Sequence, residues 1–246
     1  MSRARVWLFD LDNTLHDASH AAFAPISAAM TSYIVEHVGV EEPAATALRQ
    51  QYWRRYGATL LGLVRHHAIN AAHFLDETHR LPGLEARLRT SAHDRAALRR
   101  LVGRKYILTN APRRYALRVL DTLGLAASFD GVISIEDMAM FGQLRPKPDA
   151  RMLKRVAARL KVAPARCILV EDTLVHQKAA RGIGMTTVWM QRYLGGRFRG
   201  PAGQIAGSSQ RRNAASESAK VGVHACPSPV YVCAKIKSLQ KLPRAR

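Results

Sequence analysis

The sequence predicts an α/β fold in which a parallel sheet carries helices on both faces and a helical cap is inserted after the first strand. Short apolar runs rich in β-branched residues end at polar positions, as buried strands do. Segments with the apolar spacing of helices separate most of these runs, and this alternation is typical of parallel sheets. One long interval carries helical signals alone, which predicts the inserted cap.

Six strands are predicted in order along the chain. They cover residues 6–9, 106–108, 131–135, 167–170, 185–190 and 230–234. Helices between them are predicted from apolar residues that recur every three or four positions. These helices cover 112–123, with Leu117, Leu120 and Leu123 on one face, 148–160, with Met152, Leu153, Val156 and Leu160, and 175–181. A short helix over 236–242 is predicted to follow the last strand.

The interval between the first two strands is long and purely helical in pattern. Its apolar spacing predicts helices over residues 21–38, 44–56, 60–75 and 84–101. We therefore expect a Rossmann-like core of residues 1–18 and 101–246, interrupted by a helical cap of residues 19–100. Within the core, residues 195–221 are rich in Gly, Ser, Gln, Ala and Arg, which predicts a flexible basic loop.

Composition narrows the class of protein. The 246 residues carry a formal net charge of +20, but no recognition-helix or zinc-finger pattern accompanies the basic residues, which disfavours a nucleic-acid partner. No apolar run reaches the roughly 18 residues that a membrane span needs, so we expect a cytoplasmic protein with no membrane partner. The three cysteines lack disulfide or zinc spacing and are expected to be reduced thiols. These features leave the oligomeric state open.

Polar residues capable of chemistry follow three of the predicted strands. They are Asp10, Asp12, Thr109, Asn110, Glu171 and Asp172, with Lys147 in a loop before a helix. Because the carboxyl ends of parallel strands meet at one edge of a sheet, we expect these side chains to share a cleft. Several carboxylates in one cleft repel one another unless a hard cation lies among them, which predicts Mg²⁺ as a cofactor.

This set of groups suits phosphoryl transfer. An Asp carboxylate can attack phosphorus and form an aspartyl phosphate, which makes Asp10 the candidate nucleophile. Asp12, two residues on, can protonate the leaving oxygen and then activate water. Thr109 and Lys147 can hold the phosphoryl oxygens and offset their charge, and Asn110 is expected to bind phosphate beside them. The expected partner is a small phosphorylated metabolite.

Four motifs resemble those of haloacid dehalogenase-like hydrolases. Residues 9–15, Phe-Asp-Leu-Asp-Asn-Thr-Leu, are similar to the first motif, DxDxT, and residues 108–110, Leu-Thr-Asn, to the second. Residues 147–148, Lys-Pro, are similar to the third motif, and residues 170–173, Val-Glu-Asp-Thr, to the fourth. All four occur in the family's order, and the resemblance implies a hydrolase of this superfamily.

The resemblance also implies roles for individual residues. Asp10 would be both the nucleophile and a magnesium ligand, and Asp12 the general acid and base whose main-chain carbonyl also binds the metal. Asp172 would be the third metal ligand. Glu171 would lie in the outer shell, where it contacts a metal-bound water or Lys147.

Within the superfamily, the chain resembles the pyrimidine 5′-nucleotidase type with a helical cap. The resemblance rests on the first and second motifs and on Tyr-Gly-Ala-Thr-Leu at residues 56–60. It implies a nucleoside 5′-monophosphate as substrate. Tyr52 and Tyr56 of the predicted cap could stack on a base, and Arg65 is a further candidate contact in the cap. His176 departs from the pattern, since related proteins often place Asn at this position.

Other interpretations are open at this point. A sugar phosphate or phosphoglycolate would suit the same fold and chemistry, because the cap selects the leaving group. A nucleic-acid-binding protein with a vestigial hydrolase site is an alternative of another class, although the complete set of catalytic motifs argues against it. A dehalogenase is disfavoured, since it needs neither Asp12 nor a metal. Tyr52 and Tyr56 would equally suit the apolar core of the cap, where aromatic residues at helical spacing are common.

Overall fold

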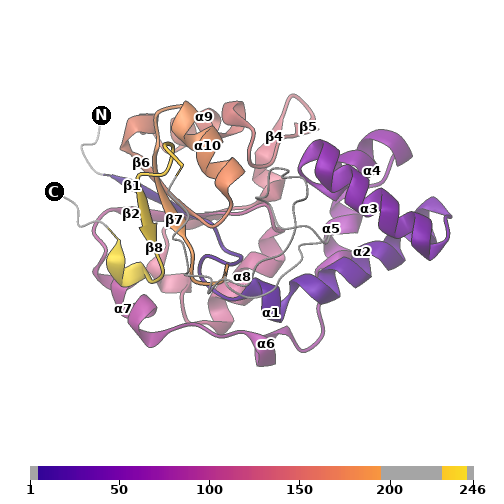
Figure 1. The fold of residues 1–246 in the computed structure, drawn as a ribbon, viewed down its shortest axis with the longest axis horizontal. Coiled ribbons are helices and arrows are strands. Elements are labelled where there is room, and N and C mark those ends of the chain that lie inside the picture. Colours follow the sequence, from indigo (N-terminus) through magenta and orange to yellow (C-terminus); the bar gives the residue numbers. More distant parts are fainter. Residues whose placement is uncertain (1–4, 195–228, 243–246) are drawn as a thin grey trace, which may run out of the picture.

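The structure is a computed structural model that describes residues 5–194 and 229–242, and its main sheet has six parallel strands within those residues (Figure 1). The strands are β1 (Val6–Phe9), β2 (Arg104–Leu108), β3 (Gly131–Ile133), β6 (Cys167–Glu171), β7 (Thr186–Met190) and β8 (Ala234–Ile236). Their order in space is β3-β2-β1-β6-β7-β8. The order reverses between β1 and β6, which creates a crevice beyond the carboxyl ends of these two strands.

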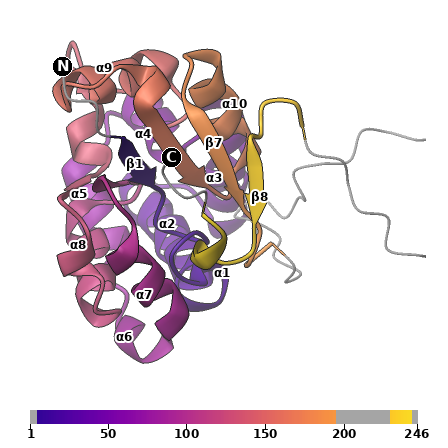
Figure 2. The ribbon, with the colours of Figure 1, turned by 90° about the vertical axis from the view of Figure 1, so that its left-hand side faces the viewer.

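Helices cover both faces of the sheet, as predicted. The helices of the core are α7 (Ala92–Arg100), α8 (Arg113–Thr122), α9 (Ala150–Arg159) and α10 (Leu174–Gly182). Trp7 and Phe9 of β1 belong to an apolar cluster with α7 and α8, whereas Val6 and Leu8 point to the other face and pack with α9 and α10. Figure 2 shows α9 and α10 on one side of the sheet and α7 on the other.

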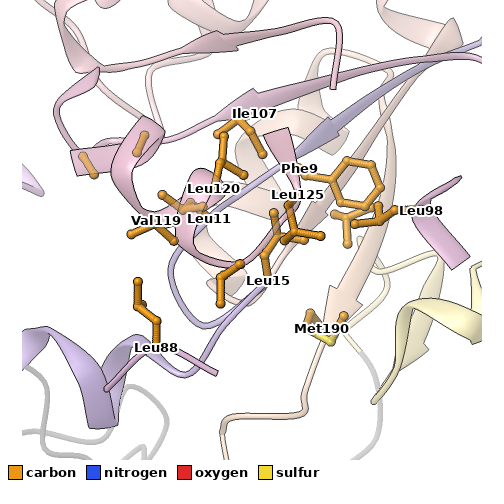
Figure 3. Packing of buried hydrophobic residues seen from close by; sticks show 14 of the residues in the cluster. Phe9, Leu11, Leu15, Leu88, Leu98, Ile107, Val119, Leu120, Leu125 and Met190 are labelled. Atoms are coloured by element: carbon orange, nitrogen blue, oxygen red, sulfur yellow. The ribbon is translucent and has the colours of Figure 1, made fainter. Parts of the chain in front are cut away.

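The larger cluster anchors the first strand (Figure 3). Phe9 lies among Leu98 of α7, Leu120 of α8 and Met190 of β7, all of which are buried. The ring of Phe129 meets that of Phe9 edge-on, with 5.7 Å between the ring centroids. Each large apolar side chain buried in this way contributes about 1.5–3 kcal/mol to stability. The residue that follows Phe9 is therefore held at a fixed place.

The prediction that Leu117 of α8 belongs to the core is wrong. Leu117 is 41% exposed, whereas Leu120 and Leu123 are buried as predicted. The buried stripe of α8 also includes Tyr115 and Val119. Since buried residues of a helix recur every three or four positions, Leu117 falls on the solvent side of this stripe. In α9, by contrast, all four predicted core residues are buried.

The last strand begins later than predicted. The structure places β8 over Ala234–Ile236, and Val230, at the start of the predicted strand, is fully exposed. Ile236 is the apolar side chain that reaches the core cluster, which fixes the strand at its position. A single 3₁₀ turn, η4 (Leu239–Lys241), stands where a helix was predicted.

A helical cap lies between β1 and β2 in the sequence, and its own apolar core is formed by α2 to α5. The helices outside the sheet core are α1 (Ala18–Ala21), α2 (Phe23–Val38), α3 (Glu42–Tyr56), α4 (Thr59–His67), α5 (Ala71–Thr78) and α6 (Leu84–Arg87). Helices α2 to α5 have an apolar cluster of their own, centred on Ile34, Leu63 and Phe74. Leu84 of α6 and Leu98 of α7 instead join the cluster of the sheet. The division of the chain after residues 18 and 100 stays a prediction.

The remaining elements are short. They are an antiparallel ribbon of β4 (Ala139–Met140) and β5 (Gln143–Leu144), and the 3₁₀ helices η1 (Ala126–Ser128), η2 (Ile135–Met138) and η3 (Pro164–Arg166). Ile135 of η2 packs into the apolar cluster of the cap, so the core contacts the cap on this side.

The remaining predictions concern the basic loop, the cysteines and membrane-spanning helices. The predicted basic loop over 195–221 lies outside the described residues, as does Cys226. Cys167 and Cys233 are both free thiols. None of the helices in the described ranges has the length and apolar character needed to cross a bilayer.

Candidate active site

The predicted site residues converge at the carboxyl ends of β1, β2 and β6. Asp10 directly follows β1, and its N–H donates to the carbonyl of Val170 at 2.9 Å. Thr109 directly follows β2, and its N–H donates to the carbonyl of Ile133 at 3.0 Å. Glu171 is the last residue of β6. Hydrogen bonding therefore continues one residue past β1 and β2, which fixes the backbone of both residues.

The ammonium group of Lys147 is buried between two carboxylates. Its Nζ lies 2.7 Å from Oδ1 of Asp10 and 2.7 Å from Oε2 of Glu171. The side chain is 1% exposed, so these contacts replace the solvation that its charge has lost. Burial alone would lower the pKa of Lys147, but the two carboxylates hold it above its ordinary value. Lys147 therefore carries its positive charge in the site.

The side chain of Asn110 holds the loop that carries Lys147. Its Nδ2 donates to the carbonyl of Lys147 at 3.0 Å, and its Oδ1 accepts from the N–H of Lys147 at 2.9 Å. These two bonds pair the amide of the side chain with the backbone of a residue 37 positions away. The contact seen for Asn110 is thus a positioning contact, and its predicted contact with phosphate stays a prediction.

Both carboxylate oxygens of Glu171 are engaged. Besides the contact of Oε2 with Lys147, Oε1 accepts from the N–H of Thr173 at 3.2 Å and lies 3.2 Å from Nδ1 of His176. Burial alone would raise the pKa of Glu171, but Lys147 and His176 hold it well below its usual range. His176, which departs from the family pattern in the sequence, thus lies against the fourth motif.

Asp10, Glu171 and Asp172 form a group that could hold a metal ion. One carboxylate oxygen from each lies within 4.8 Å of the others. Burial, and then repulsion by Glu171, raises the pKa of Asp10 to about 7 and that of Asp172 well above its ordinary value. A divalent cation would remove this repulsion, and carboxylate oxygens are ligands that Mg²⁺ prefers. The residues present therefore fit the predicted metal.

Asp12 has two partners that sequence reasoning missed. Its Oδ1 accepts from the hydroxyl of Tyr115 at 2.8 Å and lies 3.0 Å from Nε2 of His16. His16 is fully buried and lies four residues after Asp12, a spacing that could have suggested a contact. Tyr115 is 103 positions away, and only the packing of α8 against β1 brings it to Asp12.

Two buried threonines, Thr14 and Thr109, also lie in the site. The hydroxyl of Thr14 donates to Oδ2 of Asp10 at 3.3 Å. The hydroxyl of Thr109 accepts from the N–H of Ala111 at 3.0 Å, and Thr109 is 1% exposed. The predicted contact of Thr109 with phosphate stays a prediction.

A cavity of about 570 Å³ lies between the cap and the core. Its walls include Leu75 of α5, His79, which follows α5, Tyr115 and Arg118 of α8, and Glu136 of η2. Burial lowers the pKa of His79 to about 4, so this imidazole is neutral at neutral pH. Because Tyr115 also donates to the carboxylate of Asp12, the cavity adjoins the candidate general acid.

The three cap residues predicted to contact substrate do not line this cavity. Tyr52 is 7% exposed, and its hydroxyl lies 2.7 Å from Nε2 of His67. The hydroxyl of Tyr56 lies 2.6 Å from Nε2 of His66, and the guanidinium carbon of Arg65 lies 6.0 Å from the centre of the Tyr56 ring. Tyr52 thus belongs to the cap core, and the substrate contacts of all three residues stay predictions.

The sequence is similar to a known protein family and to two characterised proteins. A protein-family model described as haloacid dehalogenase-like hydrolase matches residues 4–184. Phosphate metabolism protein 8 of Saccharomyces cerevisiae is 24% identical over 194 residues, which cover 74% of this chain and 60% of that protein. A plasmid phosphoglycolate phosphatase of Cupriavidus necator is 33% identical over 138 residues, which cover 54% of this chain and 53% of that protein. The chain thus spans between half and two thirds of the length of these curated relatives.

Solved structures share the fold. The hydrolase YfnB from Bacillus subtilis, bound to magnesium, has a TM-score of 0.55 at 18% identity and covers 98% of this chain and 97% of its own. CbbY from Rhodobacter sphaeroides, in complex with phosphate, has a TM-score of 0.57 at 17% identity and covers 97% and 96%. At these identities the similarity concerns the fold alone, while the family model matches well over half of the sequence. The chain belongs to the haloacid dehalogenase-like hydrolase family.

Proposed function

We propose that this protein is a magnesium-dependent phosphomonoester hydrolase that acts on a small phosphorylated metabolite. The observation that carries the proposal is the buried arrangement of Asp10, Lys147 and Glu171 at the β1/β6 crevice, with Asp172 beside it. A nucleophilic carboxylate, a fixed ammonium group and a cation-sized group of carboxylates are the parts that phosphoryl transfer needs.

The proposed reaction has two steps. In the first, a carboxylate oxygen of Asp10 attacks phosphorus, the bond to the leaving oxygen breaks, and Asp12 gives that oxygen its proton. In the second, Asp12 takes a proton from water, the water oxygen attacks the aspartyl phosphate, and phosphate leaves with Asp10 restored. Lys147 and Thr109 hold the phosphoryl oxygens and offset their charge during both steps.

The proposed metal ligands are Asp10, Asp172 and the main-chain carbonyl of Asp12. Glu171 would stay in the outer shell, which agrees with the engagement of both its oxygens by neighbouring groups. When bound, Mg²⁺ would neutralise the crowded carboxylates and the incoming phosphate. The Bacillus subtilis protein of the same fold is bound to magnesium, which supports magnesium as the metal.

The proposed substrate is a nucleoside 5′-monophosphate, and a pyrimidine nucleotide in particular. The cavity of about 570 Å³ beside Tyr115 falls within the range of roughly 300–1,000 Å³ typical of pockets for small molecules, and it would accommodate a nucleoside. A sugar phosphate or phosphoglycolate is the second candidate, favoured by the similarity to the Cupriavidus necator phosphatase over about half of the chain.

A substrate panel tests the proposal. Phosphate release would be measured with UMP, CMP, purine nucleotides, sugar phosphates and phosphoglycolate, with and without Mg²⁺, for the wild type and for Asp10→Asn. We expect turnover of UMP or CMP that needs the metal and falls by a factor on the order of 10⁴ or more in the variant, as for other nucleophile substitutions. Activity on sugar phosphates or phosphoglycolate alone would keep the mechanism and reject the nucleotide. The absence of activity on every ester would reject the proposed function.

A further inference from the structure

One buried charge in the cap has no role in the proposed reaction. Arg49 of α3 is 7% exposed, which places its guanidinium inside the cap. Its Nε donates to the hydroxyl of Thr31 on α2 at 3.2 Å. Its Nη1 is buried and has no hydrogen-bond partner in the part of the chain that the structure describes. The guanidinium therefore keeps one N–H without a partner inside the cap, where water has little access.

No carboxylate neutralises this guanidinium among the described residues. Burial lowers the pKa of Arg49, and no neighbouring charge acts in the other direction. The buried Lys147 of the same chain, by contrast, lies 2.7 Å from each of two carboxylates. Buried charges in proteins are normally paired, because the lost solvation is otherwise uncompensated. The missing partner of Arg49 is what a bound anion would supply.

Arg49 lines a cavity of about 410 Å³ between α2 and α3. The cavity could hold more than a single water, which occupies roughly 30 Å³ in the liquid. Hydroxyl-bearing side chains from both helices share its lining, namely Ser27, Thr31, Ser32 and Thr46. The hydroxyl of Thr31 already donates to the carbonyl of Ser27 at 3.1 Å. An Arg together with the remaining hydroxyls is the combination that recognises phosphate and carboxylate groups. Glu42, which is exposed, also lines the cavity and opposes an anion.

We propose that the cavity between α2 and α3 is a binding site for an oxyanion, a phosphate or carboxylate group that pairs with the guanidinium of Arg49. The anion is either a free ion or an anionic end of a substrate molecule, and both sources offer the same chemistry to the site. This site lies in the cap and is built from residues other than those of the catalytic site. It therefore goes beyond the proposed hydrolase function.

The C-terminal end of α3 connects this site to the catalytic loop. Gly57, which follows α3, packs close to the residue after Lys147: a Cβ placed on Gly57 would lie 3.8 Å from Cδ of Pro148. Arg49 lies two turns earlier on the same helix. An anion that fixes Arg49 would thus stabilise a helix that contacts the loop of Lys147.

The test uses the full chain and inorganic phosphate as the probe. Phosphate would be titrated by calorimetry in the presence of a chelator, so that the catalytic site lacks its metal. The wild type would be compared with Arg49→Met, and Arg54→Met, which changes an exposed Arg of the same helix, would serve as the matched control. We expect Arg49→Met to weaken phosphate binding at least tenfold and Arg54→Met to leave it within about twofold. Equal phosphate affinity in the wild type and Arg49→Met would overturn the proposal.

A second variant covers the case in which Arg49→Met fails to fold. Glu42 is exposed, so Glu42→Gln should fold normally while it removes the carboxylate that opposes the anion. We expect phosphate to bind this variant several-fold more tightly. Unchanged or weaker binding would contradict the site, and weaker binding with lower stability would mean that Glu42 is the partner of Arg49.

Kinetics of Arg49→Met then distinguish the two sources of the anion. If the substrate supplies it, KM should rise at least tenfold for a substrate with a second anionic group and stay unchanged for p-nitrophenyl phosphate. If a free ion supplies it, KM should be unchanged for both compounds while the loss of phosphate binding persists. Either result supports the oxyanion site, and neither result depends on whether a nucleotide is the substrate of the enzyme.

Discussion

Replacement of Asn110 by Ala would separate a positioning role from a phosphate-binding role. The side chain makes two hydrogen bonds with the backbone of Lys147, at 3.0 and 2.9 Å. Each such bond contributes about 0.5–1.5 kcal/mol net, so their loss should lower the free energy of unfolding by about 1–3 kcal/mol. Urea denaturation followed by circular dichroism would measure this change.

The same substitution should slow catalysis through Lys147. The ammonium group of Lys147 contacts Asp10 at 2.7 Å, and a displacement of about 1 Å in an active site can reduce the rate roughly 100-fold. We therefore expect Asn110→Ala to lower kcat by about that factor on p-nitrophenyl phosphate. Asn110→Asp keeps the acceptor for the N–H of Lys147 but turns an anionic oxygen, in place of the donor, towards the carbonyl of Lys147. It should therefore lower the free energy of unfolding at least as much as Asn110→Ala does.

Unfolding and kinetic measurements on Asn110→Ala could also refute the positioning role of Asn110. If Asn110→Ala unfolds like the wild type, and only its KM and its affinity for phosphate change, then the side chain binds phosphate directly. Positioning of Lys147 would then rest on other contacts.

Three further changes test other parts of the structure. Tyr115→Phe removes the hydroxyl that donates to Asp12 at 2.8 Å. In steady-state assays kcat should fall roughly ten- to 100-fold, equivalent to about 1.5–3 kcal/mol, while KM stays unchanged. Magnesium must displace the proton that Asp10 holds below its pKa of about 7, so metal affinity measured by calorimetry should fall by a factor that approaches about tenfold for each pH unit below 7. Gly62→Ala would place a Cβ 2.1 Å from Cγ of Tyr52, so urea unfolding should show a loss of about 1–3 kcal/mol or more.

Controls for these changes come from the same chain. Gly182 of α10 has open space around it, so Gly182→Ala should be neutral or stabilising by up to about 1 kcal/mol. A similar loss in both glycine variants would contradict the packing argument for the cap. A metal affinity independent of pH between 5 and 7 would contradict the protonation of Asp10, and wild-type kcat in Tyr115→Phe would remove Tyr115 from the reaction.

The raised pKa of Asp10 also has a consequence for the metal-free protein. The folded state holds a proton that the unfolded chain, with an ordinary pKa of 3.8, has already released. The contribution of this group to stability is therefore lost as the pH rises from about 4 to about 7. Addition of Mg²⁺ should reduce this dependence, which thermal unfolding at several pH values would measure.

Local pattern was sufficient to predict the sheet and the positions of the site residues along the chain. Buried parallel strands are continuous apolar runs, and β1 and β6 have this pattern because both of their faces are covered by helices. The strands also end where the predicted polar residues begin, so Asp10, Thr109 and Glu171 could be assigned to strand ends. The exposed Leu117 and the late start of β8 were predicted wrongly, because helix phase and strand position depend on the partner surface.

The sequence by itself determined the α/β fold, the helical cap and the identity of the groups that meet at the β1/β6 crevice. Only the tertiary structure decided which of them touch. Lys147 reaches Asp10 across 137 positions and Tyr115 reaches Asp12 across 103. Such contacts leave no periodic signal in the sequence, because they depend on how separate elements pack. Arg49 is of the same kind, because the absence of a carboxylate beside it, within the described residues, depends on how α2 and α3 pack together.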